Sequence, residues 1–425
     1  MSIVKKSFRT LREFSAFLLV GTAIALIWAN TNQEVYDAFI EAPVAVWWNG
    51  GLQAALEWLH HHHGGGHALN FHFLVNDGFM VLFFGIAGKE VSESFLPGGA
   101  LSSLEKASMP VMGTLGGVIG PVALFFALHF ALGTPGELAN AWAVPAATDI
   151  AYAWLFAGLI FGRGHPAVTF LLVLAVLDDM IGMCIIAFFY SSGIQPAWLG
   201  LVVLGMAACE VMRRMGVSNF WPYILIGGPL SWVGLHETGV HAALALVPIV
   251  PFMPHAERDE GLFADDEGHH DTMHNFESFF SPIVDVGLFT FGLANAGVAL
   301  TGEAFAGAVT WIIFCSLVVG KTIGVWAFAW GVEKLGLSLP EHMKLRELPI
   351  IGCVAGIGFT VALFVTAVTL QLDSFQHLEH AEAMGDMLKL GALLSFAAGP
   401  IAWIASRIMD VERIPADESG ASSGH

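Results

Sequence analysis

Charged side chains are scarce in this chain. Asp, Glu, Lys and Arg together make up 12% of its 425 residues, whereas soluble domains carry about 25%. Hydrophobic residues make up 56%, and the mean hydropathy is +0.68. Polar stretches are too short for a large soluble domain, and runs of about 20 apolar residues fit helices that span a ~30 Å hydrocarbon core. The sequence therefore predicts an all-α polytopic membrane protein in a lipid bilayer.

Cysteine is also rare, and its spacing excludes the usual metal and redox motifs. The four cysteines are single and scattered through apolar runs, at Cys184, Cys209, Cys315 and Cys353. No C-x-x-C pair is present, so we expect small buried residues and no cofactor. The net charge of −19 comes mostly from loops and tails, and such an acidic balance disfavours nucleic acid as a partner.

We read twelve spans from the apolar runs. They lie at 14–30, 70–92, 108–133, 140–162, 166–190, 196–213, 219–235, 237–253, 276–300, 305–331, 348–371 and 385–408. Residues 1–410 would form one transporter domain, and 411–425 a disordered cytoplasmic tail. The basic N-terminus resembles a signal peptide, but its apolar run is long and lacks a convincing cleavage site, so an uncleaved first span is favoured.

Basic residues are absent from the loops on one side of this twelve-span arrangement. Fourteen of the 17 Lys and Arg residues fall on the same side as the N-terminus, and Lys89, Lys321 and Lys389 lie within or at the ends of spans. Positive loops face the cytoplasm. We therefore expect both termini to be cytoplasmic.

Two histidine-rich loops have alternative interpretations. The first outer loop, 31–69, contains His60 to His63 and His67, which favours a polar, Gly-rich extension over a metal-binding tract. The acidic loop 254–274 contains four more histidines. It is interpreted as a solvated loop, with a pH-responsive surface as the alternative.

Three acids lie inside consecutive apolar spans. Asp149 is in the fourth span, and Asp178 and Asp179 are adjacent in the fifth. Each costs roughly 2.5–3.5 kcal/mol at bilayer depth, which indicates an ion or proton site. Adjacent side chains on a helix diverge by about 100°, and Lys321 is the natural counter-charge for one of them. A single structural ion pair would need only one acid.

The fourth and eleventh spans are interrupted. Pro145 precedes Asp149 by four residues, and three glycines and Thr360 lie within 352–360. Paired interruptions in two halves of a chain are typical of inverted-repeat transporters. Close helix packing through Gly352 and Gly356 is the alternative for the eleventh span, and both can hold.

The chemistry of these residues favours cation–proton exchange. Carboxylates and backbone carbonyls are hard ligands suited to Na⁺ or Li⁺, and H⁺ competes for the same oxygens. If one Na⁺ displaces two protons, the exchange is electrogenic. A Na⁺-coupled solute symporter is the alternative, but no polar cluster beyond the ion site suggests a solute pocket. An intramembrane aspartyl protease lacks support, because no G-x-G-D segment is present. We expect a transporter and no enzyme.

Motifs along almost the whole chain resemble the NhaA-type sodium/proton antiporter family. They are A-G-K-E-V at Glu90, W-A-V-P-A-A-T-D-I-A, L-D-D, T-G-V-H-A at His241, A-N-A-G-V at Asn295, G-K-T-I-G at Lys321 and G-I-G-F-T at Thr360. The resemblance implies twelve spans, crossed fourth and eleventh helices, and a bacterial inner membrane. It implies that Asp178 and Asp179 bind Na⁺ and protons, that Lys321 pairs with Asp178, and that Asp149 and Thr148 support the crossing.

The resemblance also assigns Glu90 and Glu277 to a cytoplasmic pH-response funnel, with departures. The family's basic residues and Glu after Glu90 are replaced by the run 92–94, Ser-Glu-Ser, and its histidines near Glu277 by Ser278 and Ser281. In the family, the first outer loop forms a homodimer through a β-hairpin. Here that loop is longer and His-rich, which leaves the homodimer and the pH set point open.

Overall fold

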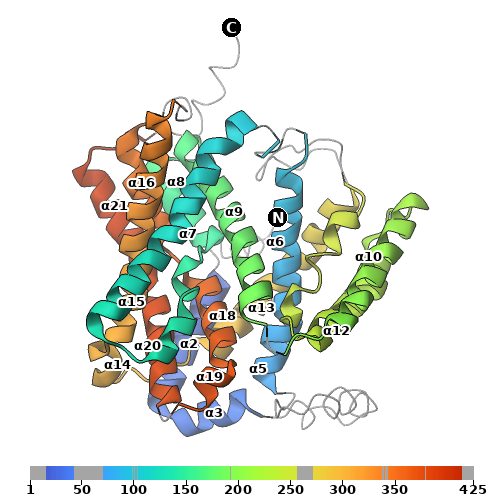
Figure 1. Cartoon of the computed structure of the whole chain (residues 1–425), viewed down its shortest axis with the longest axis horizontal. Coiled ribbons are helices and arrows are strands. Elements are labelled where there is room, and N and C mark those ends of the chain that lie inside the picture. Colours follow the sequence, from blue (N-terminus) through green and yellow to red (C-terminus); the bar gives the residue numbers. More distant parts are fainter. Residues whose placement is uncertain are drawn as a thin grey trace, which may run out of the picture. The chain divides into compact units, whose positions relative to one another are not determined.

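The structure is a computed structural model that describes residues 16–42, 70–97, 99, 101–102, 104–191, 193–255, 271–336, 339, 343–378 and 380–413. Helices dominate the described residues (Figure 1). They form two compact units. Unit 1 is drawn from Met1–Lys89, Ser191–His255 and Gly268–Leu300, and unit 2 from Glu90–Tyr190, Ala256–Glu267 and Thr301–His425.

Seven described helical segments are long and apolar enough to cross a membrane. In unit 1 they are α5–η2–α6 (Phe71–Ser94, whose last residues belong to unit 2), η5–α10 (Pro196–Arg214) and α13 (Thr272–Asn295). In unit 2 they are α7 (Leu104–Leu132), α9 (Pro166–Phe189), α15–η9–α16 (Ala308–Lys334) and α20–η11–α21 (Ala381–Ile408). Two bent helix pairs raise the number of spans among the described residues to at most nine, if each pair counts as one span. The chain is therefore a multi-pass membrane protein.

The other described helices outside the two bent pairs lack the length or the apolar character of those seven segments. They are α2 (Ala16–Thr31), α3 (Gln33–Ile40), α11–η6–α12 (Phe220–Thr238), α14 (Gly302–Ala306) and α19 (Asp373–Gln376). The first and seventh expected spans coincide with α2 and α11–η6–α12.

The expected eighth span, 237–253, differs in the structure. α12 ends at Thr238 because Gly239 takes a left-handed conformation with φ 88°. Only two single 3₁₀ turns follow, η7 (Ala242–Leu244) and η8 (Val250–Phe252). Two prolines in this stretch lack the N–H that a helix interior needs, so an apolar run of spanning length remains irregular.

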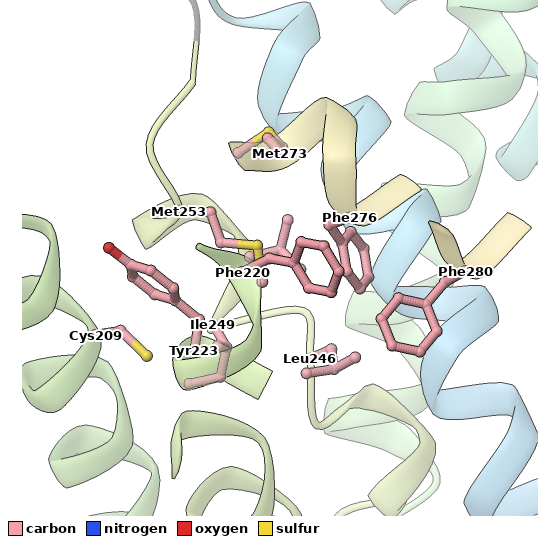
Figure 2. Close-up of a cluster of buried hydrophobic side chains, with 10 residues drawn as sticks. Cys209, Phe220, Tyr223, Leu246, Ile249, Met253, Met273, Phe276 and Phe280 are labelled. Atoms are coloured by element: carbon pink, nitrogen blue, oxygen red, sulfur yellow. The ribbon is translucent and has the colours of Figure 1, made fainter. Parts of the chain in front are cut away.

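Unit 1 has an aromatic and methionine-rich core that joins α10, α11, η6, the irregular segment after α12, and α13 (Figure 2). Figure 2 shows the Phe220 ring lying next to the Phe276 ring, with Met253 close by. The buried members are Cys209, Phe220, Tyr223, Leu246, Ile249, Val250, Met253, Met273, Phe276 and Phe280. This packing explains how the irregular segment is held without a helix of its own.

In unit 2, glycines bring helix backbones into contact around Lys321. α16 (Lys321–Lys334) packs along α7, as Figure 1 shows. A Cβ on Gly320 would lie 2.6 Å from Cα of Pro121 in α7, and a Cβ on Gly356 would lie 2.6 Å from the carbonyl oxygen of Leu317. Side chains other than hydrogen would force these elements apart, so the glycines allow the close backbone contacts on either side of Lys321.

Candidate functional site

The first bent pair consists of η3 (Gly136–Ala141) and η4 (Val144–Ala146), followed by α8 (Ile150–Phe161). The two halves meet at 52°. Pro145 lies within η4, and Ala147 is already extended with φ −77° and ψ 151°. Helix geometry resumes only after Asp149. The interruption expected in the fourth span is therefore present, and it leaves Thr148 and Asp149 in non-helical backbone.

The second bent pair consists of η10 (Leu345–Glu347) with α17 (Leu348–Ala355), followed by α18 (Phe359–Leu370). Its halves meet at 48°. The break between them, 356–358, contains two glycines and no ionisable side chain. It is the interruption expected in the eleventh span. All of its residues are buried, so the backbone groups that α17 and α18 do not satisfy need partners from other elements.

Asp149 joins the two breaks. Its backbone N–H donates to the carbonyl of Ile357 at 2.6 Å. Its carboxylate accepts from the N–H of Tyr152 at 3.3 Å, in the first turn of α8, and from the N–H of Thr360 at 3.1 Å, in the first turn of α18. The hydroxyl of Thr360 donates to the same carboxylate. One negative charge therefore caps two helix N-termini, each of which carries about half a positive charge.

Lys321 is connected to the C-terminal end of α17, which directly precedes the second break. Its ammonium donates to the hydroxyl oxygen of Thr148, and that hydroxyl donates to the carbonyl of Ala355 at 2.9 Å, at the C-terminal end of α17. The ammonium also lies 2.5 Å from a carboxylate oxygen of Asp178, and both side chains are fully buried. The positive charge is thus compensated by a carboxylate and by the negative end of a helix.

Asp178 and Asp179 have different surroundings although they are adjacent in α9. Asp178 uses Oδ2 for the ion pair with Lys321, while Oδ1 is buried with no hydrogen-bond partner among the described residues. Asp179 is 8% exposed, and its Oδ1 also has no such partner. Buried carboxylate oxygens without donors are expensive. They are suited to receive a proton or a hard cation.

The two acids expected to shape the pH response are on helices that do not contribute to this cluster. Glu90 is half-buried in α6 (Met80–Ser94), where its carbonyl accepts from the hydroxyl of Ser94. Glu277 in α13 makes an ion pair of 2.7 Å with Lys89, which is only 6% exposed. Glu277 and Lys89 belong to unit 1, and the carboxylate cluster belongs to unit 2.

The described residues contain no group of three or more His, Cys, Asp or Glu side chains that could hold a metal ion. Any cation at Asp178 and Asp179 would therefore need further oxygens from hydroxyl or backbone groups. Non-helical carbonyls at the two breaks are oxygens of that kind.

Comparison with known proteins identifies the family of the chain. A family model described as Na⁺/H⁺ antiporter 1 matches residues 5–404. The chain belongs to the Na⁺/H⁺ antiporter 1 family. It is 44% identical to a Na⁺/H⁺ antiporter NhaA of Geobacter sulfurreducens and to the NhaA 2 protein of Pelobacter propionicus, over 97% of this chain and 100% of each relative. A NhaA protein of Desulfitobacterium hafniense is 42% identical over 97% of this chain and 99% of the relative. The family resemblance drawn from the motifs is confirmed.

Two residues that the sequence did not single out for the site belong to its hydrogen-bond network. Thr360 donates twice to Asp149, and Ser395 accepts from the N–H of Gly358. Thr360 stood in a glycine-rich motif and could have been selected as a donor at a helix start. Ser395 is a lone serine in an apolar run, and its sequence neighbours give no signal that it bonds to another span.

Proposed function

We propose that this chain is a secondary antiporter that exchanges cytoplasmic Na⁺ or Li⁺ for external H⁺ by alternating access. The observation that carries the proposal is the asymmetry of Asp178 and Asp179. One carboxylate is paired with a buried lysine, and both keep a buried oxygen that has no hydrogen-bond donor among the described residues. The family relationship supports Na⁺ and H⁺ as the transported ions, since its NhaA relatives are described as Na⁺/H⁺ antiporters.

In this proposal Asp178 and Asp179 bind the cation and the protons. Lys321 balances Asp178 while the cation is absent. Thr148 and Asp149 hold the two breaks together, so that the carbonyls of the breaks stay near the cation path. The interrupted spans would be the crossed fourth and eleventh helices of a twelve-span inverted-repeat transporter. Their bends of 52° and 48° and their mutual hydrogen bonds support that architecture.

The charge count gives the proposed stoichiometry. With two acids and one lysine in one buried cluster, one Na⁺ displaces two protons. One proton leaves Asp179, and the other leaves either Asp178 or Lys321. The titration is then a property of the coupled group rather than of a single residue. Each cycle moves one net charge, so the membrane potential drives Na⁺ out with about 2.3 kcal/mol per charge per 100 mV.

Inverted membrane vesicles test the exchange directly. Addition of Na⁺ or Li⁺ should collapse a preformed pH gradient when the unaltered protein is present. Asp178→Asn and Asp179→Asn should each abolish this response, because each removes a negative charge from the cluster. Both variants must be checked for membrane insertion. Near-normal exchange in either inserted variant would remove that residue from the cation site.

Proteoliposomes test the charge movement. A K⁺ ionophore that dissipates the built-up potential should accelerate Na⁺-driven proton flux if one Na⁺ exchanges for two protons. A rate that ignores the ionophore would make the exchange electroneutral and exclude the two-proton scheme. Lys321→Ala separates the two routes. Surviving electroneutral exchange would assign the second proton to Lys321, and surviving electrogenic exchange would assign it to Asp178.

Glu90 and Glu277 are proposed to shape the pH response. The ion pair between Lys89 and Glu277 is a reason to treat this chain separately from family members with histidines near that glutamate. The expected result of Glu277→Gln is a displaced pH–rate profile with unchanged dependence on Na⁺ at the optimum. An unmoved profile would remove Glu277 from the pH response.

The remaining parts of the proposal concern location and assembly. We place the chain in a bacterial inner membrane as one domain over 1–410, with both termini cytoplasmic. The described residues do not include 43–69 of the first outer loop, 256–270 of the acidic loop or 414–425 of the expected tail. The homodimer therefore stays a prediction, and so does the interpretation of the His-rich loop.

A further inference from the structure

Ser395 lies where the last span changes from α20 (Ala381–Leu394) to α21 (Ala398–Ile408) through the 3₁₀ turn η11 (Ser395–Ala397). Its side chain is fully buried. Its hydroxyl donates to the carbonyl of Ala392 at 2.6 Å in its own helix and accepts from the backbone N–H of Gly358 at 3.2 Å. Ser395 therefore connects the last span to the second break.

The direction of these two hydrogen bonds is determined by chemistry. A serine hydroxyl has one proton, and here that proton is committed to Ala392, so the oxygen can only accept from Gly358. The N–H of Gly358 precedes the first turn of α18, where helical partners are missing. At bilayer depth an N–H without an acceptor costs several kcal/mol. Ser395 supplies that acceptor, as Asp149 does for Thr360 two residues later.

Phe396 adds a packing contact at the same point. Its ring centroid lies 5.3 Å from that of Tyr152 and 5.9 Å from that of Phe359. Tyr152 and Phe359 belong to the first turns of α8 and α18. The rings of Tyr152 and Phe359 also meet edge to face, with centroids 5.6 Å apart. The turn at Ser395 and Phe396 therefore touches both helix starts that Asp149 caps.

We propose that Ser395 is a positioning residue for cation exchange. With Phe396 it forms a brace that fixes the start of α18 and so aims the donors of Thr360 at Asp149. This inference rests on the proposed function, because the quantity it predicts is the apparent affinity for Na⁺. The brace acts through the backbone of Gly358, and Ser395 itself is not assigned as a cation ligand.

The experiment compares Ser395→Ala and Ser395→Cys with a matched control in the same span. Ser406 is also buried, and it donates to the carbonyl of Trp403 at 2.7 Å in its own helix. Ser406→Ala therefore removes the same kind of local bond. The readouts are the apparent KM for Na⁺ and Li⁺ and the maximal rate in inverted vesicles, together with thermal unfolding in detergent.

We expect Ser395→Ala to raise the apparent KM for both cations about five- to tenfold, as expected from one lost buried hydrogen bond. The maximal rate should change less than the KM. Ser395→Cys should lie between alanine and the unaltered protein, because sulfur is a weak acceptor. It also replaces the alanine variant in the comparison if the latter fails to insert. Ser406→Ala should leave the KM unchanged.

An unchanged KM in the inserted Ser395 variants would overturn the brace, and so would the same loss of rate and stability in Ser395→Ala and Ser406→Ala. Failure of the proposed function itself would look different. In that case the unaltered protein would show no Na⁺-dependent proton flux, and no KM could be measured for any variant.

Discussion

The two breaks in unit 2 each interrupt a bent helix pair, but they differ in the polar groups that they contribute. The first, 147–149, contributes the side chains of Thr148 and Asp149. The second, 356–358, contributes only backbone groups, and its neighbours supply what those groups need. Asp149 and Thr148 bond to the carbonyls of Ile357 and Ala355, while Ser395 accepts from the N–H of Gly358.

This difference shows how an irregular backbone can be kept at bilayer depth. Glycine allows close approach to neighbouring helices but offers no side chain to satisfy its own polar groups. The glycine-rich break can therefore pack tightly, as Gly356 does against Leu317, because Asp149 donates to the carbonyl of Ile357 and Ser395 accepts from the N–H of Gly358. The carboxylate in the first break serves both helix starts. We infer that the first break contributes a charged side chain to the site. The second break contributes the close packing of the helices around it.

Removal of the Asp149 carboxylate, which both helix starts share, should have the largest effect. Asp149→Ala leaves the N–H groups of Tyr152 and Thr360 without their acceptor, and each such group costs several kcal/mol in the membrane interior. We expect loss of more than about 3 kcal/mol of stability and no detectable exchange. Thermal unfolding in detergent and the pH-gradient assay measure these effects. A variant as stable as the unaltered protein would show that the two helix starts do not depend on Asp149.

A swap of the residues at positions 149 and 360 tests which break must carry the carboxylate. The double variant Asp149→Thr with Thr360→Asp keeps one carboxylate and one hydroxyl in the same pair but moves the charge to the second break. We expect it to unfold at a higher temperature than Asp149→Ala, because a carboxylate still faces the helix starts. The rate of Na⁺/H⁺ exchange should remain low. Equal unfolding temperatures for the two variants would mean that the charge stabilises the site only from the first break.

A smaller effect is expected from the hydroxyl of Thr360. Thr360→Val keeps the shape and the backbone N–H but removes one donor to Asp149, which corresponds to about 1–2 kcal/mol. Thr366 is the matched control in α18, since its buried hydroxyl donates to the carbonyl of Ala362 at 2.8 Å within the helix. Thr366→Val should have little effect on the KM for Na⁺, whereas Thr360→Val should raise it. Indistinguishable KM values would assign Thr360 a local role only.

Much of the candidate site could be predicted from the sequence, because ionisable groups in apolar runs are conspicuous. The free-energy cost of a charged side chain in a bilayer is enough to single out Asp149, Asp178, Asp179 and Lys321. Ser395 could not be selected in the same way, since an isolated serine in a membrane helix usually bonds to its own backbone. Its second hydrogen bond joins positions 37 residues apart, and sequence periodicity carries no information about such a contact.

The irregular eighth segment gives the same lesson for the fold. Its apolar residues predicted a span, but the aromatic and methionine-rich core of unit 1 encloses Leu246, Ile249 and Val250 without a regular helix. Hydropathy reports that a segment avoids water. It does not report whether neighbouring side chains can replace the hydrogen bonds and packing of a helix.

The sequence by itself determined that this chain crosses a membrane, which acids lie at bilayer depth, where two spans are interrupted, and to which family it belongs. Each of these follows from composition or from residues near one another in the chain. Only the tertiary structure decided that Lys321 meets Asp178 and Thr148, that Asp149 caps two helices at once, and that Ser395 reaches Gly358. Those pairings depend on how closely helix backbones approach. That approach is set by packing among segments far apart in sequence.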